Sequence, residues 1–335
     1  MKVKSTLAKN IEIADNEETS LDSACKKLLA NKNILAWILK TCIEEYAESS
    51  LQEIERKYIE GIPRVAQDAV HRDEYVENGD YIQGGSSEDS SMTEGTVTYD
   101  IKFNALKPMR KSSMNSKGVA SMIINVESQS DFYPGYPLSK RGIYYGSRMI
   151  SAQYGTIFTK SHYEKLEKVY SIWVCLNPPK YRENSINIYS FHEKQLLGRA
   201  MEKKENYDLI TVVMVCLGDE EDENCKGLLR LLSVLFSADK DINEKKEILE
   251  TEFNIAMTKT METEADEVGE FSKYFKEKGL REGRQEGIEQ GIKQGVEQAI
   301  KNLMKNADMT LEQAMTVLEV SKKDRVMYAE KIEKG

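Results

Sequence analysis

The 335-residue sequence lacks the residue patterns of several protein classes. Its five cysteines show neither a CxxC nor a Cys/His metal-ligand spacing and stand mostly in apolar segments, which is typical of buried thiols. Its three histidines are scattered, which favours structural or surface positions over catalytic ones. No signal peptide opens the chain and no apolar run reaches transmembrane length. We therefore expect a cytoplasmic protein with no membrane partner.

A surplus of positive charge is also missing. The formal net charge is -9, and this balance argues against broad nonspecific binding of nucleic acid. A protein that acts on nucleic acid would then need a local positive groove. Much of the acidity lies in residues 73–89 and 219–223. With 40% hydrophobic residues, the chain can bury one substantial core and still extend a polar tail.

Two segments rich in β-branched and aromatic residues, 96–103 and 122–129, are typical of strands. Side chains alternate along a strand, so Glu127 and Gln129 share one face of the second strand. If the strands are neighbours, the carboxylates of Asp100 and Glu127 can meet at a hard cation such as Mg²⁺. Such a metal can polarise a phosphodiester and activate water. The alternative is that these are solvent-facing positions of amphipathic strands.

These segments and the chain around them resemble the PD-(D/E)XK nuclease superfamily and, within it, the bacterial Rpn-like recombination-promoting nucleases, often labelled transposases. The resemblance covers roughly residues 20 to 300 and is carried by blocks more specific than a bare D…ExK pattern: 24–29, 34–40, 94–100, 124–154, 169–179 and 207–214. It implies an α/β fold with a restriction-endonuclease-like mixed sheet flanked by helices and a helical C-terminal extension. It also implies a DNA endonuclease, dependent on Mg²⁺ or Mn²⁺, in recombination or mobile-element biology.

Carried over position by position, the resemblance implies that Asp100 and Glu127 ligate the metal and that the Ser128 backbone carbonyl adds a ligand. Gln129 stands where the superfamily usually has lysine, and the Rpn-like branch is similar in its E-x-Q form. A glutamine can orient water but supplies no positive charge. Lys102, on the same strand face as Asp100, is a candidate for that charge. A solvated strand lysine is the alternative.

A third acid is expected from an N-terminal helix, because relatives place a glutamate from such a helix beside the metal. Apolar residues recur at helical spacing over residues 34–46, which predicts a helix with one buried stripe. Glu44 is our candidate metal ligand, with Glu45 as its neighbour. An exposed acid at the helix end is the alternative for either residue.

Residues 137–152 have the pattern of a helix that follows a turn. Lys140, Tyr144 and Arg148 fall at i, i+4 and i+8 and therefore line one helical face, with Arg141 beside them. Cations there could bind phosphates, and tyrosines could pack on sugars or bases, so these four residues are DNA-binding candidates. An ordinary amphipathic helix whose tyrosines pack on the sheet is the alternative.

Two connections are predicted to be loops. Residues 106–118 form a polar, basic link between the motif strands, and its four cations could touch a DNA backbone or be solvated. Residues 78–94 are rich in glycine, serine and acids, which predicts a surface loop. Further strands are expected at 168–176, 185–191 and 208–217, and further helices at 223–237 and 242–253.

The predicted organisation has four parts: a polar arm at 1–20, a nuclease-like domain at 21–255, a charged segment at 256–308 and a small helical unit at 309–335. In the charged segment, glycine recurs every four residues from Gly279 to Gly295. An interior helical glycine costs about 1 kcal/mol relative to alanine, so a flexible linker and a self-associating helix are both open. Thr310 and Ser321 are predicted helix N-caps.

A competing function is a noncatalytic DNA-binding or assembly protein that keeps the nuclease fold and associates with further copies through its C-terminal helices. Gln129 and the acidic balance favour it. The nuclease is our leading prediction because of the resemblance and of the Asp100 and Glu127 spacing.

Overall fold

The computed structural model describes residues 22–61, 63–65, 88–91, 95–108 and 121–333. It divides into two compact units, Met1–Ser272 and Lys273–Gly335. Within the part of the chain that is described, no helix has both the length and the apolarity needed to cross a lipid bilayer. The predicted arm at 1–20 and most of the basic connection, residues 109–120, lie outside the described residues.

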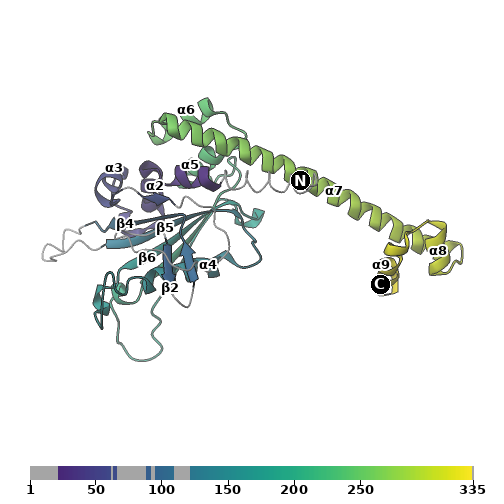
Figure 1. The fold of residues 1–335 in the computed structure, drawn as a ribbon, viewed down its shortest axis with the longest axis horizontal. Coiled ribbons are helices and arrows are strands. Elements are labelled where there is room, and N and C mark those ends of the chain that lie inside the picture. Colours follow the sequence, from purple (N-terminus) through teal and green to yellow (C-terminus); the bar gives the residue numbers. More distant parts are fainter. Residues whose placement is uncertain (1–21, 62, 66–87, 92–94, 109–120, 334–335) are drawn as a thin grey trace, which may run out of the picture. The chain divides into compact units, whose positions relative to one another are not determined.

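A mixed sheet organises the first unit (Figure 1). Its strand order is β1-β4-β5-β6-β8-β7, in which β5, β6 and β8 run parallel and the remaining pairs are antiparallel. The bounds are β1 Arg64–Val65, β4 Ile101–Leu106, β5 Ser121–Asp131, β6 Lys168–Asn177, β7 Ser185–Ser190 and β8 Ile210–Cys216. The central strands β6 and β8 are buried on both faces, as expected for apolar strands between helical layers. The unit is therefore α/β, as predicted.

The first predicted strand is divided into two strands near Asp100. β3 Gly95–Thr98 pairs with β2 Glu88–Ser91, whereas β4 begins at Ile101 and joins the main sheet. Asp100 lies at the bend between the two strands. The predicted loop over 78–94 is thus wrong at β2, because pairing with β3 satisfies the backbone of a segment whose residues have low strand propensity.

Helices cover both faces of the sheet (Figure 1). One side carries α2, α3 and α5, and the other side carries α4, which contacts β6 and β8. Besides the helix at residues 22–29, the bounds are α2 Lys32–Cys42, η1 Glu44–Tyr46, α3 Leu51–Glu53, η2 Ile54–Tyr58, α4 Leu138–Ser151, η3 Tyr163–Lys165, η4 Lys180–Arg182, η5 Lys204–Asn206, α5 Leu228–Phe236 and α6 Ile242–Phe253. The predicted helices at 137–152 and 242–253 are confirmed.

The glycine repeat lies within one helix, α7 Lys259–Asn306. The structure thus has a helix where a flexible linker was one alternative, and self-association of that helix stays a prediction. The second unit also contains α8 Leu311–Val317 and α9 Lys322–Glu333. Its small apolar core is built on Ile300, Ala314, Met315 and Tyr328.

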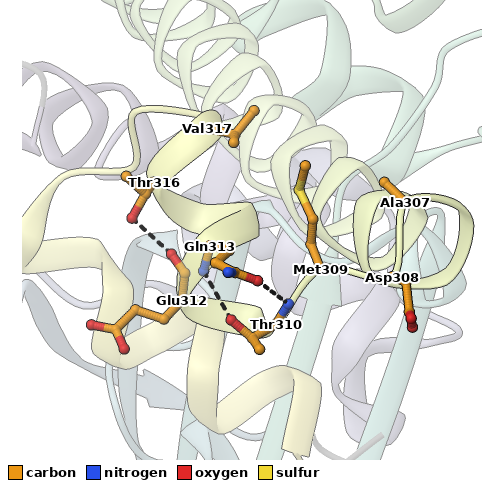
Figure 2. Close-up of a pocket in the computed structure, with 8 residues that line it drawn as sticks. All are labelled: Ala307, Asp308, Met309, Thr310, Glu312, Gln313, Thr316 and Val317. Carbon is orange, nitrogen blue, oxygen red and sulfur yellow. Dashed lines mark hydrogen bonds between the residues drawn. The ribbon is translucent and has the colours of Figure 1, made fainter.

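Both predicted N-caps of the second unit are confirmed. The Thr310 side chain accepts from the backbone N–H of Gln313, and the Ser321 hydroxyl accepts from that of Asp324. A pocket of about 820 Å³ surrounds the start of α8, and Figure 2 shows its lining residues together with the reciprocal hydrogen bonds of Thr310 and Gln313. This pocket is lined by residues of one short stretch of chain, 307–317.

Candidate functional site

The structure brings Asp100 and Glu127 into contact. Ile101 of β4 is the register partner of Val126 of β5, so the residues next to this pair also lie side by side. The backbone N–H of Asp100 donates to Glu127 Oε1 at 3.1 Å, and the backbone N–H of Ser128 donates to Asp100 Oδ2 at 3.0 Å. Each acid is only 2% exposed. Strand β5 and the bend that precedes β4 therefore hold two acids together in a buried position.

A buried lysine completes this cluster. Lys26, on the helix at residues 22–29, places its Nζ 2.9 Å from Asp100 Oδ1 and also pairs with Asp22. Asp22 Oδ1 in turn accepts from the Ser128 hydroxyl at 3.4 Å. Burial alone would lower the pKa of Lys26, but Asp100 and Asp22 raise it above its ordinary value. Lys26 is therefore a buried cation held between two carboxylates.

Burial dominates the electrostatics of both strand acids. It raises the pKa of Asp100 to about 6, although Lys26 acts in the opposite direction. Burial also raises the pKa of Glu127 well above its ordinary range, and the neighbouring Asp100 carboxylate adds to that shift, whereas Arg141 opposes it. Two adjacent buried acids with raised pKa values are typical of a site that binds a cation or a proton.

Gln129 and Lys102 lie on the strands as predicted but contact other groups. The Gln129 side-chain amide donates to the backbone carbonyl of Asp131 at 2.6 Å. The Lys102 ammonium lies 4.6 Å from the centroid of the Tyr99 ring. The lysine in direct contact with Asp100 is Lys26.

The structure does not bring Glu44 to the acid pair. Its carboxylate pairs with Lys204 at 2.9 Å, and its side chain is 74% exposed. Glu45 accepts from the Tyr170 hydroxyl at 2.8 Å. Tyr170 is the register partner of Ile124, so it lies on the sheet face opposite that of Glu127. The acid that the N-terminal helices place beside Asp100 is Asp22.

The four DNA-binding candidates of α4 divide into two pairs. Lys140 and Tyr144 are exposed. Arg148 is 5% exposed and donates to the Tyr144 hydroxyl at 3.1 Å. Arg141 is half-buried, donates to the hydroxyls of Tyr136 and Tyr145, and acts electrostatically on Glu127. Lys140 and Tyr144 are therefore the two candidates whose side chains are exposed to solvent.

Sequence reasoning missed Asp22 and Lys26 as site residues. Their i, i+4 spacing was a usable signal, because it places both on one helical face. Their neighbours Ala24, Cys25 and Leu28 are buried, so a lysine within this short apolar stretch had to find an acid inside the protein.

Carboxylates are ligands of the kind that a hard cation prefers. The Lys26 ammonium links Asp22 to Asp100, and the Asp100 backbone N–H links Asp100 to Glu127. A divalent cation bound there would offset the effect of burial and lower the raised pKa values of Asp100 and Glu127. Among the described residues, no group of three His, Cys, Asp or Glu side chains has an arrangement that could hold a metal ion. These residues therefore match a hard cation in ligand chemistry and charge, and not in their arrangement in this structure.

Comparison of the chain with protein-family models, with curated proteins and with solved structures finds no match.

Proposed function

We propose that the protein is a Mg²⁺-dependent DNA endonuclease of the PD-(D/E)XK type, similar to the Rpn-like recombination-promoting nucleases and acting in recombination or mobile-element biology. In this proposal the mixed sheet is a restriction-endonuclease-like core, and the C-terminal helices extend it. The observation that carries the proposal is the buried contact between Asp100, at the bend before β4, and Glu127 on β5. The raised pKa values of Asp100 and Glu127 support a site whose ionised acids would be stabilised by a bound cation.

The proposed reaction is hydrolysis of a phosphodiester. Asp100, Glu127 and the Ser128 backbone carbonyl would hold Mg²⁺, or Mn²⁺ in its place, and Gln129 would orient the attacking water. When bound, the metal would polarise the phosphodiester and lower the pKa of that water. The water oxygen bonds to phosphorus, one P–O ester bond breaks, and a proton passes to the leaving oxygen.

Lys26 is the proposed source of the positive charge that Gln129 lacks. Its ammonium contacts Asp100 directly, and the carboxylates keep it protonated. A cation held in this way can stabilise negative charge that develops on a phosphate. Lys102, the candidate that the strand pattern suggested for this role, lies 4.6 Å from the centroid of the Tyr99 ring, and its role stays a prediction.

Cleavage of supercoiled plasmid in Mg²⁺ tests the proposal. The wild type is expected to nick or linearise the plasmid, and Asp100→Ala and Glu127→Gln to lose activity by roughly 100-fold or more. Glu44→Gln is the matched control, because Glu44 is an exposed acid paired with Lys204. Equal activity in the wild type and Asp100→Ala would assign the cleavage to a contaminant or another site. Inactivity of the wild type on duplex and single-stranded DNA would overturn the proposal.

A noncatalytic DNA-binding or assembly protein is the second candidate function. It is favoured by the way in which the site is closed: Lys26 and the Ser128 N–H each occupy one oxygen of Asp100, and both acids are almost fully buried. DNA binding by the wild type without metal-dependent cutting, measured on the same plasmid, would support this function in place of the nuclease.

A further inference from the structure

A pocket of about 380 Å³ next to the start of α4 is lined largely by aromatic side chains. Three separate parts of the chain contribute them: the turn before α4, the short helix η4 and the strand β7. The main lining residues are Phe132, Tyr133, Tyr136, Tyr181, Arg182 and Tyr189. The volume lies within the range of about 300 to 1,000 Å³ that is usual for small-ligand sites.

Two rings of this pocket, which we call the aromatic pocket, are largely open to solvent. Tyr133 is 61% exposed and Tyr181 is 75% exposed, and their hydroxyls lie 2.8 Å apart. Rings of this size are usually buried or placed at interfaces, where their flat faces find a partner. The pocket therefore offers flat apolar surfaces to a ligand from solution.

Positive charge accompanies the rings. The guanidinium carbon of Arg182 lies 5.8 Å from the centroid of the Tyr181 ring and 5.9 Å from that of Phe132. Arg182 Nε is buried and has no hydrogen-bond partner among the residues that the structure describes. Lys180 precedes it on η4, and Lys140 is exposed on α4. The ligand that fits combines a flat ring, hydrogen-bond acceptors and negative charge.

The aromatic pocket lies on the same sheet face as Glu127. Glu127, Trp173 and Met214 are register partners across β5, β6 and β8, and Met214 lines the pocket. Two strand spacings separate Glu127 from Met214 in this row, which is about 10 Å. Arg141 bridges the two places, because it donates to the Tyr136 hydroxyl and also acts electrostatically on Glu127.

We infer that the aromatic pocket binds one unpaired base of a nucleic-acid strand whose backbone runs toward Asp100 and Glu127. The inference rests on the nucleic-acid substrate of the proposed function. A base within a duplex is stacked and paired, so only a single-stranded or extruded base can enter such a pocket. Aromatic faces stack on every base, and arginine adds a cation–π contact. The pocket therefore distinguishes single-stranded from duplex nucleic acid and does not distinguish one base sequence from another.

Binding of a short fluorescent oligonucleotide in EDTA tests this inference without any cleavage. The single strand is expected to bind more tightly than its duplex. Tyr133→Ala and Tyr181→Ala should each weaken single-strand binding by roughly 5- to 150-fold, which corresponds to the loss of one stacking contact. Tyr181→Phe keeps the ring and should bind as the wild type does. Tyr163→Ala is the matched control, because Tyr163 is 64% exposed and lies outside the pocket.

Wild-type affinity in both alanine variants would overturn the inference, as would equal losses on the duplex and the single strand or an absence of single-strand binding by the wild type. Its failure can be told from that of the nuclease. Tyrosine-dependent binding without plasmid cleavage would reject the nuclease and keep the pocket. Metal-dependent cleavage with unchanged single-strand binding in the tyrosine variants would support the nuclease and reject the pocket as a base-binding site.

Discussion

At the residue scale, Asp100 and Glu127 differ in what balances their charge. The Asp100 carboxylate contacts the Lys26 ammonium directly. The Glu127 carboxylate accepts a hydrogen bond from the backbone N–H of Asp100, and the charge of Arg141 acts to lower its pKa. The raised pKa values of Glu127 and Asp100 mean that folding disfavours the ionised form of each acid, so at neutral pH each charge lowers the free energy of unfolding. Neutralising Glu127 should relieve more of this cost than neutralising Asp100, because Asp100 also contacts Lys26.

We predict that Glu127→Gln increases the free energy of unfolding by about 0.5–2 kcal/mol, as is common when a strained functional group is relieved. Asp100→Asn should increase it less or leave it unchanged, because Lys26 then stays buried and loses its contact with a charged Asp100. Urea denaturation at pH 7 measures both. A larger gain in Asp100→Asn than in Glu127→Gln would contradict this account of the charge balance.

The role of Lys26 can be separated from that of lysines nearby. We predict that Lys26→Met reduces plasmid cleavage by roughly 100-fold, because the site loses the ammonium that contacts Asp100. Lys27→Met, at an exposed position one residue further on, and Lys102→Met should keep activity. Circular dichroism of each variant checks that the fold is retained. Full activity in Lys26→Met together with loss of activity in Lys102→Met would show that Lys102, and not Lys26, supplies the positive charge.

Lys245 provides a pH dependence of stability. It is 1% exposed, its ammonium donates to the Ala265 carbonyl at 2.8 Å, and burial lowers its pKa to about 8, against the opposing effect of Asp266 and Glu220. In the unfolded chain this pKa returns to its ordinary value of about 10.4. Between these values the unfolded chain binds more protons, so stability contributed by this group rises with pH.

We predict that the free energy of unfolding gains a contribution as pH increases from 8 to 10, and that Lys245→Met removes it. Lys246→Met is the control, because Lys246 pairs with Glu262 and is 43% exposed. Urea denaturation of the three proteins across this pH range provides the comparison. An equal pH dependence in the wild type and Lys245→Met would exclude Lys245 as its source.

At the element scale, α4 and α7 use glycine in different ways. A Cβ on Gly142 of α4 would lie 2.6 Å from Val212 Cγ1 and 3.0 Å from Trp173 Nε1. The absence of a side chain therefore lets α4 approach the sheet over the face that carries Glu127. A Cβ on Gly291 of α7 would meet no atom within 4 Å.

We predict opposite effects of alanine at these two glycines. Gly142→Ala should destabilise the protein by about 1–3 kcal/mol, because the added methyl group must displace packed side chains. Gly291→Ala should stabilise its helix by about 0.5–1 kcal/mol, through helix propensity alone. Thermal unfolding followed by circular dichroism measures both changes. A loss of stability in Gly291→Ala would indicate that another helix packs closely at the glycine repeat.

At the scale of the whole molecule, the two units have separate cores. The sheet, the acid pair and the aromatic pocket all belong to residues before Ser272, and the core on Ile300 and Tyr328 belongs to the second unit. The chemistry proposed for the protein therefore uses residues of the first unit alone.

We predict that a chain ending at Ser272 keeps metal-dependent plasmid cleavage within about twofold of the full chain, since distant sites with no shared partners usually influence one another by no more than about 0.5 kcal/mol. Light scattering at micromolar concentration then tests self-association through the C-terminal helices, which the full chain should show and the shortened chain should lack. A folded but inactive shortened chain would mean that the second unit contributes to the site. A monomeric full chain would reject the predicted association.

The sequence by itself determined most of the element types and the spacing of the strand acids. Side-chain alternation, apolar periodicity and N-cap residues are local patterns, so they predicted the strands at 168–176 and 208–217, helix α6 and the caps at Thr310 and Ser321. They did not predict β2, because its strand conformation comes from pairing with β3. That Asp100 and Glu127 ligate a metal remains a prediction.

Only the tertiary structure decided which distant residues meet. It placed Lys26 and Asp22 at Asp100, paired Glu44 with Lys204, and gathered the rings near Tyr133 and Tyr181 into one pocket. These contacts follow from strand order, register and the docking of helices on a chosen face of the sheet. None of these is a property of a short stretch of sequence, because each is set by the packing of the whole first unit.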